Sequence, residues 1–256
     1  TFRGEVAGGR LELGGEIDLK KPAEPVFDLR MKADKVLVLR NDALTMRVDT
    51  DLRLAGPLNT ALASGTVFIT ESRFFREIDI LPIGLPGKPK PKPRAAPSAK
   101  TFALPNAPFR DWKFDIAIRT RGNDPFRIRG NLANGTAAAD LKLTGSGLQP
   151  NLEGNVRVEN FVASLPFSKL TVNQGFLYFS PESPLDPSLD LQAESTVRDY
   201  RVTAYVYGKV SDPQVTIISE PPLPQAEIIA LLATGTTINE LNGGSQSSGK
   251  GLDPRA

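Results

Sequence analysis

The amino-acid sequence predicts an all-β protein, built from an antiparallel and repetitive sheet with one short helix near the C-terminal end. Three features support this fold class: apolar residues that alternate with polar ones, turn-forming residues between the alternating segments, and a glycine-containing pattern that recurs along the chain. Alternation with a period of two places apolar side chains on one face of a strand and polar side chains on the other. It favours antiparallel strands, because parallel strands are buried on both faces and are apolar throughout.

The alternation is clearest in residues 44–54, 112–119 and 201–207. In each segment, apolar side chains occupy nearly every second position, and charged or other polar side chains lie between most of them. The apolar positions that form the predicted dry face are Leu44, Met46, Val48, Leu52, Leu54, Trp112, Phe114, Ile116, Ile118, Leu189, Leu191, Val202, Ala204 and Val206.

This dry face has to be covered, and the pattern allows two ways of covering it. One is the interior of an ordinary sandwich or closed barrel. The other is a sheet curled into a trough, whose apolar lining receives acyl chains or the strands of another protein. The alternation alone does not distinguish these two arrangements.

Turn residues and glycines add detail to the sheet. Asn134-Gly135 lies between two strand candidates, residues 126–133 and 136–144, and predicts a two-residue hairpin turn there. An apolar-x-apolar-x-Gly pattern recurs along the chain. Because glycine weakens a strand, its repeated placement predicts a bend or a close backbone approach at a fixed height in the sheet. The glycines concerned are Gly15, Gly56, Gly65, Gly130, Gly145, Gly154 and Gly208.

The chain divides into five segments by composition. A Lys/Pro-rich run favours extended, solvated conformations and is interpreted as a linker or an insertion. After the last alternating segment, prolines followed by an apolar run and Gly235 predict a short helix. The predicted segments are a β-repeat region (1–86), the linker (87–101), a β-groove region (102–219), a Pro-rich turn with the helix (220–236) and a disordered Gly/Ser tail (237–256).

Composition argues against several classes of function. The 256 residues carry 31 basic and 29 acidic side chains, and this net charge of +2 argues against a nucleic-acid-binding protein. There is neither cysteine nor histidine, so thiol chemistry, the commonest general base and the commonest metal ligand are missing. We therefore expect no enzymatic activity, no metal and no cofactor. Asp49 and Asp51 share the wet face with Arg47 and Arg53, and we interpret these four residues as a solvated charge ladder.

Two further patterns point away from other classes. Residues 244–250 match most of a phosphate-binding loop, but Gly251 replaces the hydroxyl residue and no strand–turn–helix frame surrounds the segment. No apolar run is long enough for a membrane helix, and no signal peptide opens the chain. We interpret the sequence as a fragment or a mature product whose targeting segment lies elsewhere.

The last third of the chain resembles the C-terminal domain of the TamB family, the inner-membrane component of the translocation and assembly module. The resemblance covers about residues 155–236, and residues 1–154 are compatible with the repetitive β region upstream of that domain. The Lys/Pro-rich run and the Gly/Ser tail depart from the family pattern. The segments that carry the resemblance are 170–179, 187–193, 200–208, 212–224 (with its D-P-x-V-x-I and S-x-P-x-L-P motifs) and 227–235.

The resemblance implies a long sheet folded like a taco around an apolar interior, in a periplasmic protein anchored in the inner membrane by a segment upstream of Thr1. It implies two roles: carrying phospholipid toward the outer membrane, and helping a TamA-type barrel protein to insert outer-membrane proteins such as autotransporters. The expected partners are phospholipid acyl chains, the TamA-type barrel and outer-membrane protein clients. The alternative is an extracytoplasmic β-repeat protein, structural or adhesive, with a closed core. The candidate partner-contact residues are Val215, Ile217, Ile228, Leu231 and Leu232.

Overall fold

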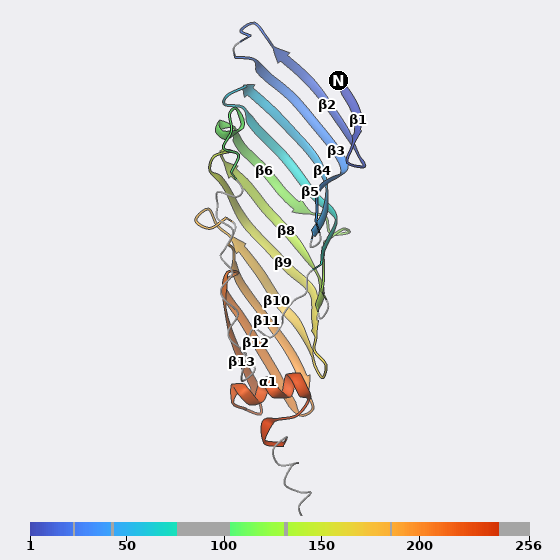
Figure 1. Cartoon of the computed structure of the whole chain (residues 1–256), viewed down its shortest axis with the longest axis vertical. Coiled ribbons are helices and arrows are strands. Elements are labelled where there is room, and N and C mark those ends of the chain that lie inside the picture. The colour runs from blue at the N-terminus through green and yellow to red at the C-terminus, as the bar shows by residue number, and fades with distance from the viewer. Residues whose placement is uncertain (23, 42–43, 76–102, 131–132, 185, 241–256) are drawn as a thin grey trace, which may run out of the picture.

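The computed structural model describes residues 1–22, 24–41, 44–75, 103–130, 133–184 and 186–240. The chain forms one sheet of 13 strands followed by a short helix, so the predicted all-β class is confirmed (Figure 1). The elements are β1 (Phe2–Val6), β2 (Gly9–Asp18), β3 (Val26–Arg40), β4 (Leu44–Pro57), β5 (Leu62–Phe75), the 3-10 turn η2 (Phe109–Asp111), β6 (Lys113–Thr120), β7 (Phe126–Arg129), β8 (Ala133–Gly145), β9 (Pro150–Ser164), β10 (Lys169–Phe179), β11 (Ser188–Val197), β12 (Tyr200–Lys209), β13 (Asp212–Glu220) and α1 (Gln225–Thr234).

The strands follow one another in the sheet in nearly the same order as in the chain. Neighbouring described strands pair antiparallel, except that β5 pairs in parallel with β6 and with β7. Parallel strands need a connection of about a dozen residues or more. The connection from β5 to β6 is long, and it contains the Lys/Pro-rich run 87–101, which lies outside the described residues. The strands before and after this run therefore belong to one sheet.

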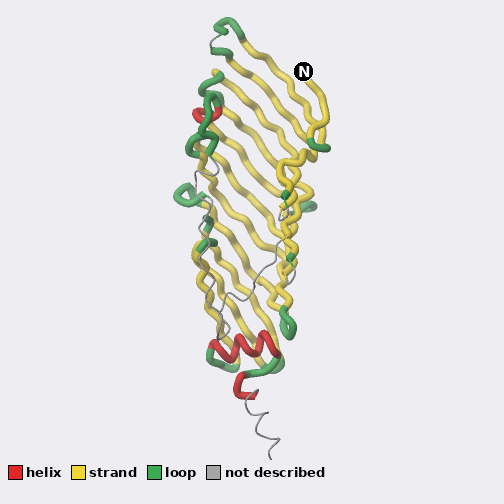
Figure 2. The backbone as a smooth tube through the Cα atoms, viewed as in Figure 1, coloured by secondary structure: helices red, strands yellow, loops and turns green. Residues whose placement is uncertain are grey.

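The sheet is an open single layer rather than a sandwich or a closed barrel. Apart from α1, which lies against β13, each described strand makes its main contacts with its neighbours in the sheet. The path runs from β1 to β13 without a pairing that closes it, and the two strands lie at opposite ends of an elongated, twisted ribbon (Figure 2). Within the described ranges, the closed core that the sequence left open as an alternative is not formed.

Among the described residues, a cluster of buried apolar side chains forms where α1 covers the sheet. The helix follows Pro224 and ends at Gly235, which takes the left-handed conformation with φ of 75°. Ile228 and Leu231 of the helix and Val202 of β12 are each 0% exposed and belong to one apolar cluster. The helix therefore closes one end of the apolar face.

The predicted hairpin at Asn134-Gly135 is wrong. Both residues lie within β8, where they pair with β7, and the chain reverses before Ala133 instead. The Gly130 N–H donates a hydrogen bond to the Ala133 carbonyl oxygen across that reversal. A β-carbon at Gly135 would lie 2.7 Å from the Phe161 ring, so this glycine makes room for an aromatic side chain of β9 rather than for a turn.

Two of the recurring glycines, Gly65 and Gly154, allow the close backbone approach that the sequence predicts. Gly65 and Gly154 have φ of 133° and 119°, values that L side chains rarely adopt. A β-carbon at Gly65 would lie 2.1 Å from the Asp51 carbonyl oxygen, and one at Gly154 would lie 2.4 Å from that of Asp140. The neighbouring strand is β4 for Gly65 and β8 for Gly154, and only glycine fits against each of them.

The beginning of the predicted tail is held against the body of the protein. The Ile238 N–H donates to the Glu227 carboxylate at 2.6 Å, and Arg198 forms an ion pair with Glu240 at 3.0 Å. Residues 241–256 lie outside the described part of the chain. No helix among the described residues is long and apolar enough to cross a membrane.

Candidate functional site

The register of the sheet places the predicted apolar residues of β4 and β6 on one face. Leu52 lies opposite Gly65 of β5, which lies opposite Ile116 of β6. Two residues along each strand, Ala63 of β5 lies opposite both Leu54 of β4 and Phe114 of β6. Because directly opposed residues point to the same side of a sheet, two predicted segments some 60 residues apart form one apolar surface.

This apolar face continues through strands that the sequence analysis did not assign to it. Leu13 of β2 lies opposite Met31 of β3, which lies opposite Leu52. On the other side, Ile116 lies opposite Leu143 of β8, which lies opposite Leu152 of β9. The signal was present in the sequence, because residues 27–33 alternate as regularly as residues 44–54. The face therefore extends without interruption from β2 to β9.

The second group of predicted residues continues the face toward the C-terminal end. Leu191 of β11 lies opposite Val206 of β12, which lies opposite Val215 of β13. The next row contains Ala204 and Ile217. Predicted groove positions and predicted partner-contact positions of β13 thus share one surface.

Exposure divides the predicted residues into an open part and a covered part. Val202 and Ala204 are buried in the cluster around α1, so the helix, and not an open groove, covers them. Val48 and Ile116 are also buried, at 5% and 8% exposure, between their strand neighbours. The remaining predicted groove positions are half-buried: Leu44, Met46, Leu52, Leu54, Trp112, Phe114, Ile118, Leu189, Leu191 and Val206.

Trp112 and the helix residues have structural contacts of their own. The Trp112 indole N–H donates to the Leu58 carbonyl oxygen at 2.7 Å, and its ring packs edge-on against Phe109 with centroids 5.0 Å apart. Trp112 therefore fixes the loop after β4 to the start of β6. Ile228, Leu231 and Leu232 are at most 2% exposed and pack against the protein's own sheet.

The opposite face of the sheet carries cross-strand ion pairs. Arg53 of β4 donates two hydrogen bonds to the Asp28 carboxylate of β3, at 2.8 and 2.9 Å. These bonds stabilise the charged carboxylate, so the pKa of Asp28 lies below its ordinary value of 3.8. Arg119 and Asp140 form a similar pair at 2.9 Å between β6 and β8.

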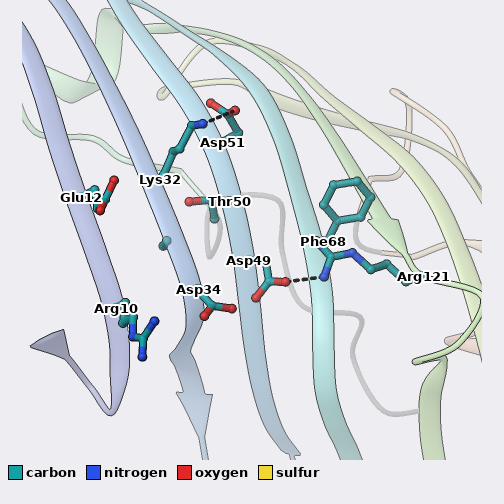
Figure 3. Close-up of a pocket in the computed structure, with 10 residues that line it drawn as sticks. Arg10, Glu12, Lys32, Asp34, Asp49, Thr50, Asp51, Phe68 and Arg121 are labelled. Atoms are coloured by element: carbon teal, nitrogen blue, oxygen red, sulfur yellow. Dashed lines mark hydrogen bonds and ion pairs between the residues drawn. The ribbon is translucent and has the colours of Figure 1, made fainter.

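A hollow of about 410 Å³ lies on this polar face, between β2 and the segment that follows β6. Figure 3 shows the residues that line it. Arg121 lies over the Phe68 ring, 4.6 Å from its centroid, and forms an ion pair with Asp49. Lys32 lies 3.8 Å from Asp51. The two aspartates thus pair with Arg121 and Lys32 rather than with the Arg47 and Arg53 of the predicted ladder, and they do not form a convergent carboxylate site.

Comparison with known proteins decides the family. The family model of the TamB C-terminal domain matches residues 1–253, nearly the whole chain. The chain belongs to the TamB family. The translocation and assembly module subunit TamB of Haemophilus influenzae is 28% identical over 201 residues, which cover 68% of this chain and 14% of that protein. This chain therefore spans only a small part of the length of that TamB relative.

The match extends the resemblance noted above to the strands before β9 and across the Lys/Pro-rich run. The strands β1–β8, which the sequence analysis found only compatible with a TamB-like region, lie within the matched residues. Among the described residues of this TamB-family chain, no three acidic side chains converge in a way that could hold a metal ion. The main feature of the described sheet is its apolar face, which α1 covers at the C-terminal end and whose other side chains are mostly half-buried.

Proposed function

We propose that this chain is a segment of a periplasmic conduit whose apolar face carries the acyl chains of phospholipids between the inner and outer membranes. The observation that supports this proposal is the open single layer: an apolar face that runs through successive strands from β2 to β9 with no second layer packed on it within the described ranges. In the full-length protein, the conduit would be anchored in the inner membrane by a segment outside this sequence.

The energetics favour an apolar occupant for this face. Exposed apolar surface costs roughly 25 cal/mol per Å², and a large contiguous patch on a soluble protein usually marks a binding site. An acyl chain regains roughly 0.8 kcal/mol for each methylene group that it buries. Leu52, Phe114 and Leu191 are half-buried, so their side chains remain available to such a ligand.

A specific observation supports a second role, in the assembly of outer-membrane proteins. β13 ends the described sheet, and it pairs only with β12. The free edge of such a strand can pair with a strand of another protein by β-augmentation. We infer that a TamA-type barrel or an outer-membrane protein client pairs here, with Val215 and Ile217 facing the apolar side.

Photocrosslinking tests the lipid conduit directly. A photoreactive amino acid at position 52, 114 or 191 should label phospholipid in cells. The matched controls are the adjacent positions 53, 113 and 190, which point to the polar face and should not label lipid. Equal labelling of the two faces would contradict the conduit, whereas labelling of protein strands only at positions 215 and 217 would favour the assembly role.

A further inference from the structure

A second hollow on the polar face has an unbalanced charge. It has a volume of about 450 Å³ and lies where β3 ends, β4 begins and β7 joins the sheet. Its lining contains five arginines and one carboxylate, Glu71; the arginines are Arg40, Arg47, Arg73, Arg127 and Arg129. We call this hollow the arginine pocket. Its volume falls within the ordinary range of ligand pockets, about 300–1,000 Å³.

The register brings arginines close together in this pocket. Arg40 of β3 lies opposite Thr45 of β4, and Thr45 lies opposite Arg73 of β5. Arg73 lies directly opposite Arg127 of β7. Like charges directly opposite one another destabilise a sheet. This row therefore places positive charges side by side at a cost in stability.

The carboxylates near the pocket do not neutralise these charges. Glu71 lies 2.7 Å from Lys35 and 3.6 Å from Arg47, so it is already shared between two cations. Asp124 is 4.0 Å from Arg127 and accepts a hydrogen bond from the Glu71 backbone N–H. Among the residues that the structure describes, no ion pair or side-chain hydrogen bond connects Arg40, Arg73 or Arg129 to another residue.

The same face shows a different pattern elsewhere. Arg53 is paired with Asp28, Arg119 with Asp140 and Lys142 with Asp115, each across neighbouring strands. Cross-strand pairing of opposite charges is the arrangement that stabilises a sheet. The arginine pocket departs from that arrangement, so its charges call for an anion that the protein does not supply from its described residues.

We propose that the arginine pocket binds a phosphate group. The guanidinium group is planar and presents paired N–H donors whose spacing matches two oxygens of a phosphate, and several arginines around one hollow can bind it from different sides. The phosphate belongs either to a phospholipid head group or to a free phosphate compound. This site is on the polar face, and its existence does not depend on lipid in the apolar groove.

The first experiment measures whether phosphate stabilises the protein. The melting temperature is recorded in sodium phosphate and in sodium chloride at equal ionic strength. A ligand that binds the folded state raises the melting temperature, and we expect a rise of about 2 °C or more for the wild type. The Arg73→Gln/Arg127→Gln variant should lose this specific rise. General stabilisation by phosphate salts acts on both proteins equally, so the difference between them reports the site.

Matched variants separate a binding site from a structural one. Arg53→Gln/Arg119→Gln removes the same charge from ion-paired positions and should keep the phosphate response. In chloride, the Arg73→Gln/Arg127→Gln variant should melt at or above the wild-type temperature, because it removes like charges that lie opposite one another. No specific response in the wild type, an equal response in both double variants, or a strongly destabilised pocket variant in chloride would each overturn the proposal.

Vesicles distinguish the two sources of phosphate. The wild-type protein is floated with vesicles of phosphatidylcholine, with and without phosphatidylglycerol. The site would be assigned to a lipid head group if three results agree: the wild type binds the anionic vesicles, inorganic phosphate prevents this binding, and the pocket variant does not bind. A phosphate response without binding to vesicles would assign it to free phosphate compounds. Because the readout differs from groove photocrosslinking, a failure here leaves the conduit proposal standing.

Discussion

Lys35 and Glu71, on strands β3 and β5, both take the left-handed backbone conformation and form an ion pair with each other. Their φ angles are 53° and 43°, and the Lys35 Nζ lies 2.7 Å from a Glu71 carboxylate oxygen. Arg47 on β4 lies between them, donating to the Lys35 carbonyl oxygen at 2.6 Å. The pairing registers of β3 and β5 both shift close to these residues, which identifies them as part of two neighbouring β-bulges.

The carboxylates of neighbouring segments hold these bulges in place. The Lys35 N–H donates to Asp49 at 2.8 Å, and the Glu71 N–H donates to Asp124 at 2.9 Å. One backbone amide in each of these two bulges thus has a carboxylate partner. Bulges increase the local twist and bend the strand. We infer that this pair of bulges bends the sheet beside the arginine pocket.

The first prediction concerns the backbone at Lys35. Lys35→Gly loses an exposed ion pair, which contributes little in water, but relieves a left-handed conformation that costs about 1–2 kcal/mol, so the stability should stay within about 1 kcal/mol of wild type. Lys35→Val loses the same pair and places a β-branched residue in the left-handed region, so it should be about 2 kcal/mol less stable than the glycine variant. Urea denaturation measures the difference. Equal stability of the two variants would show that the backbone at this position is not strained.

The second prediction concerns acid. Because Arg53 lowers the pKa of Asp28 below 3.8 in the folded protein, their interaction contributes stability at neutral pH. That contribution should disappear as the pH falls through about 4 and below, where the carboxylate becomes protonated. The stability difference between wild type and Asp28→Asn should therefore shrink as the pH falls below about 4 and on through the lowered pKa of Asp28 in the folded protein.

The third prediction concerns the glycines of the repeat. Gly65→Ala and Gly154→Ala should each destabilise the protein by about 2–4 kcal/mol, because the methyl group collides with a carbonyl oxygen of the neighbouring strand and the backbone is in a region unfavourable for alanine. Gly122→Ala is the matched control. It meets nothing within 4 Å, and its stability should stay within about 0.5 kcal/mol of wild type. Similar effects at all three positions would remove the structural basis of the repeat.

The sequence predicted the strands and the helix because both leave a local signal. Residues 44–54 alternate with a period of two, and residues 225–234 lie between proline and glycine. The open form of the sheet left no such signal, because alternation shows that one face is dry but not what covers it. The parallel pairing of β5 with β6 was also hidden, since it joins strands on the two sides of the Lys/Pro-rich run.

The errors about individual residues have local causes. Asn134-Gly135 is a good turn signal, but tertiary packing of Phe161 against Gly135 places the pair inside β8. The short apolar run at residues 228–232 has no clear polar face, so the sequence did not show that Ile228, Leu231 and Leu232 would all pack inward. The arginine pocket was missed because Arg73 and Arg127 are 54 positions apart and become neighbours only through the parallel pair of β5 and β7.

The last prediction compares the two parts of the apolar face. Leu231 is completely buried between α1 and the sheet, so Leu231→Ala should cost about 2–5 kcal/mol of stability. Leu52 lies on the open part and is only half-buried. Leu52→Ala removes the same atoms, but it creates no closed cavity and should cost about 1 kcal/mol or less. Denaturant unfolding of the two variants measures this contrast, with circular dichroism to confirm that each retains its sheet. A Leu52→Ala variant as unstable as Leu231→Ala would show that another part of the protein covers Leu52, and it would remove the open apolar face on which the conduit proposal depends.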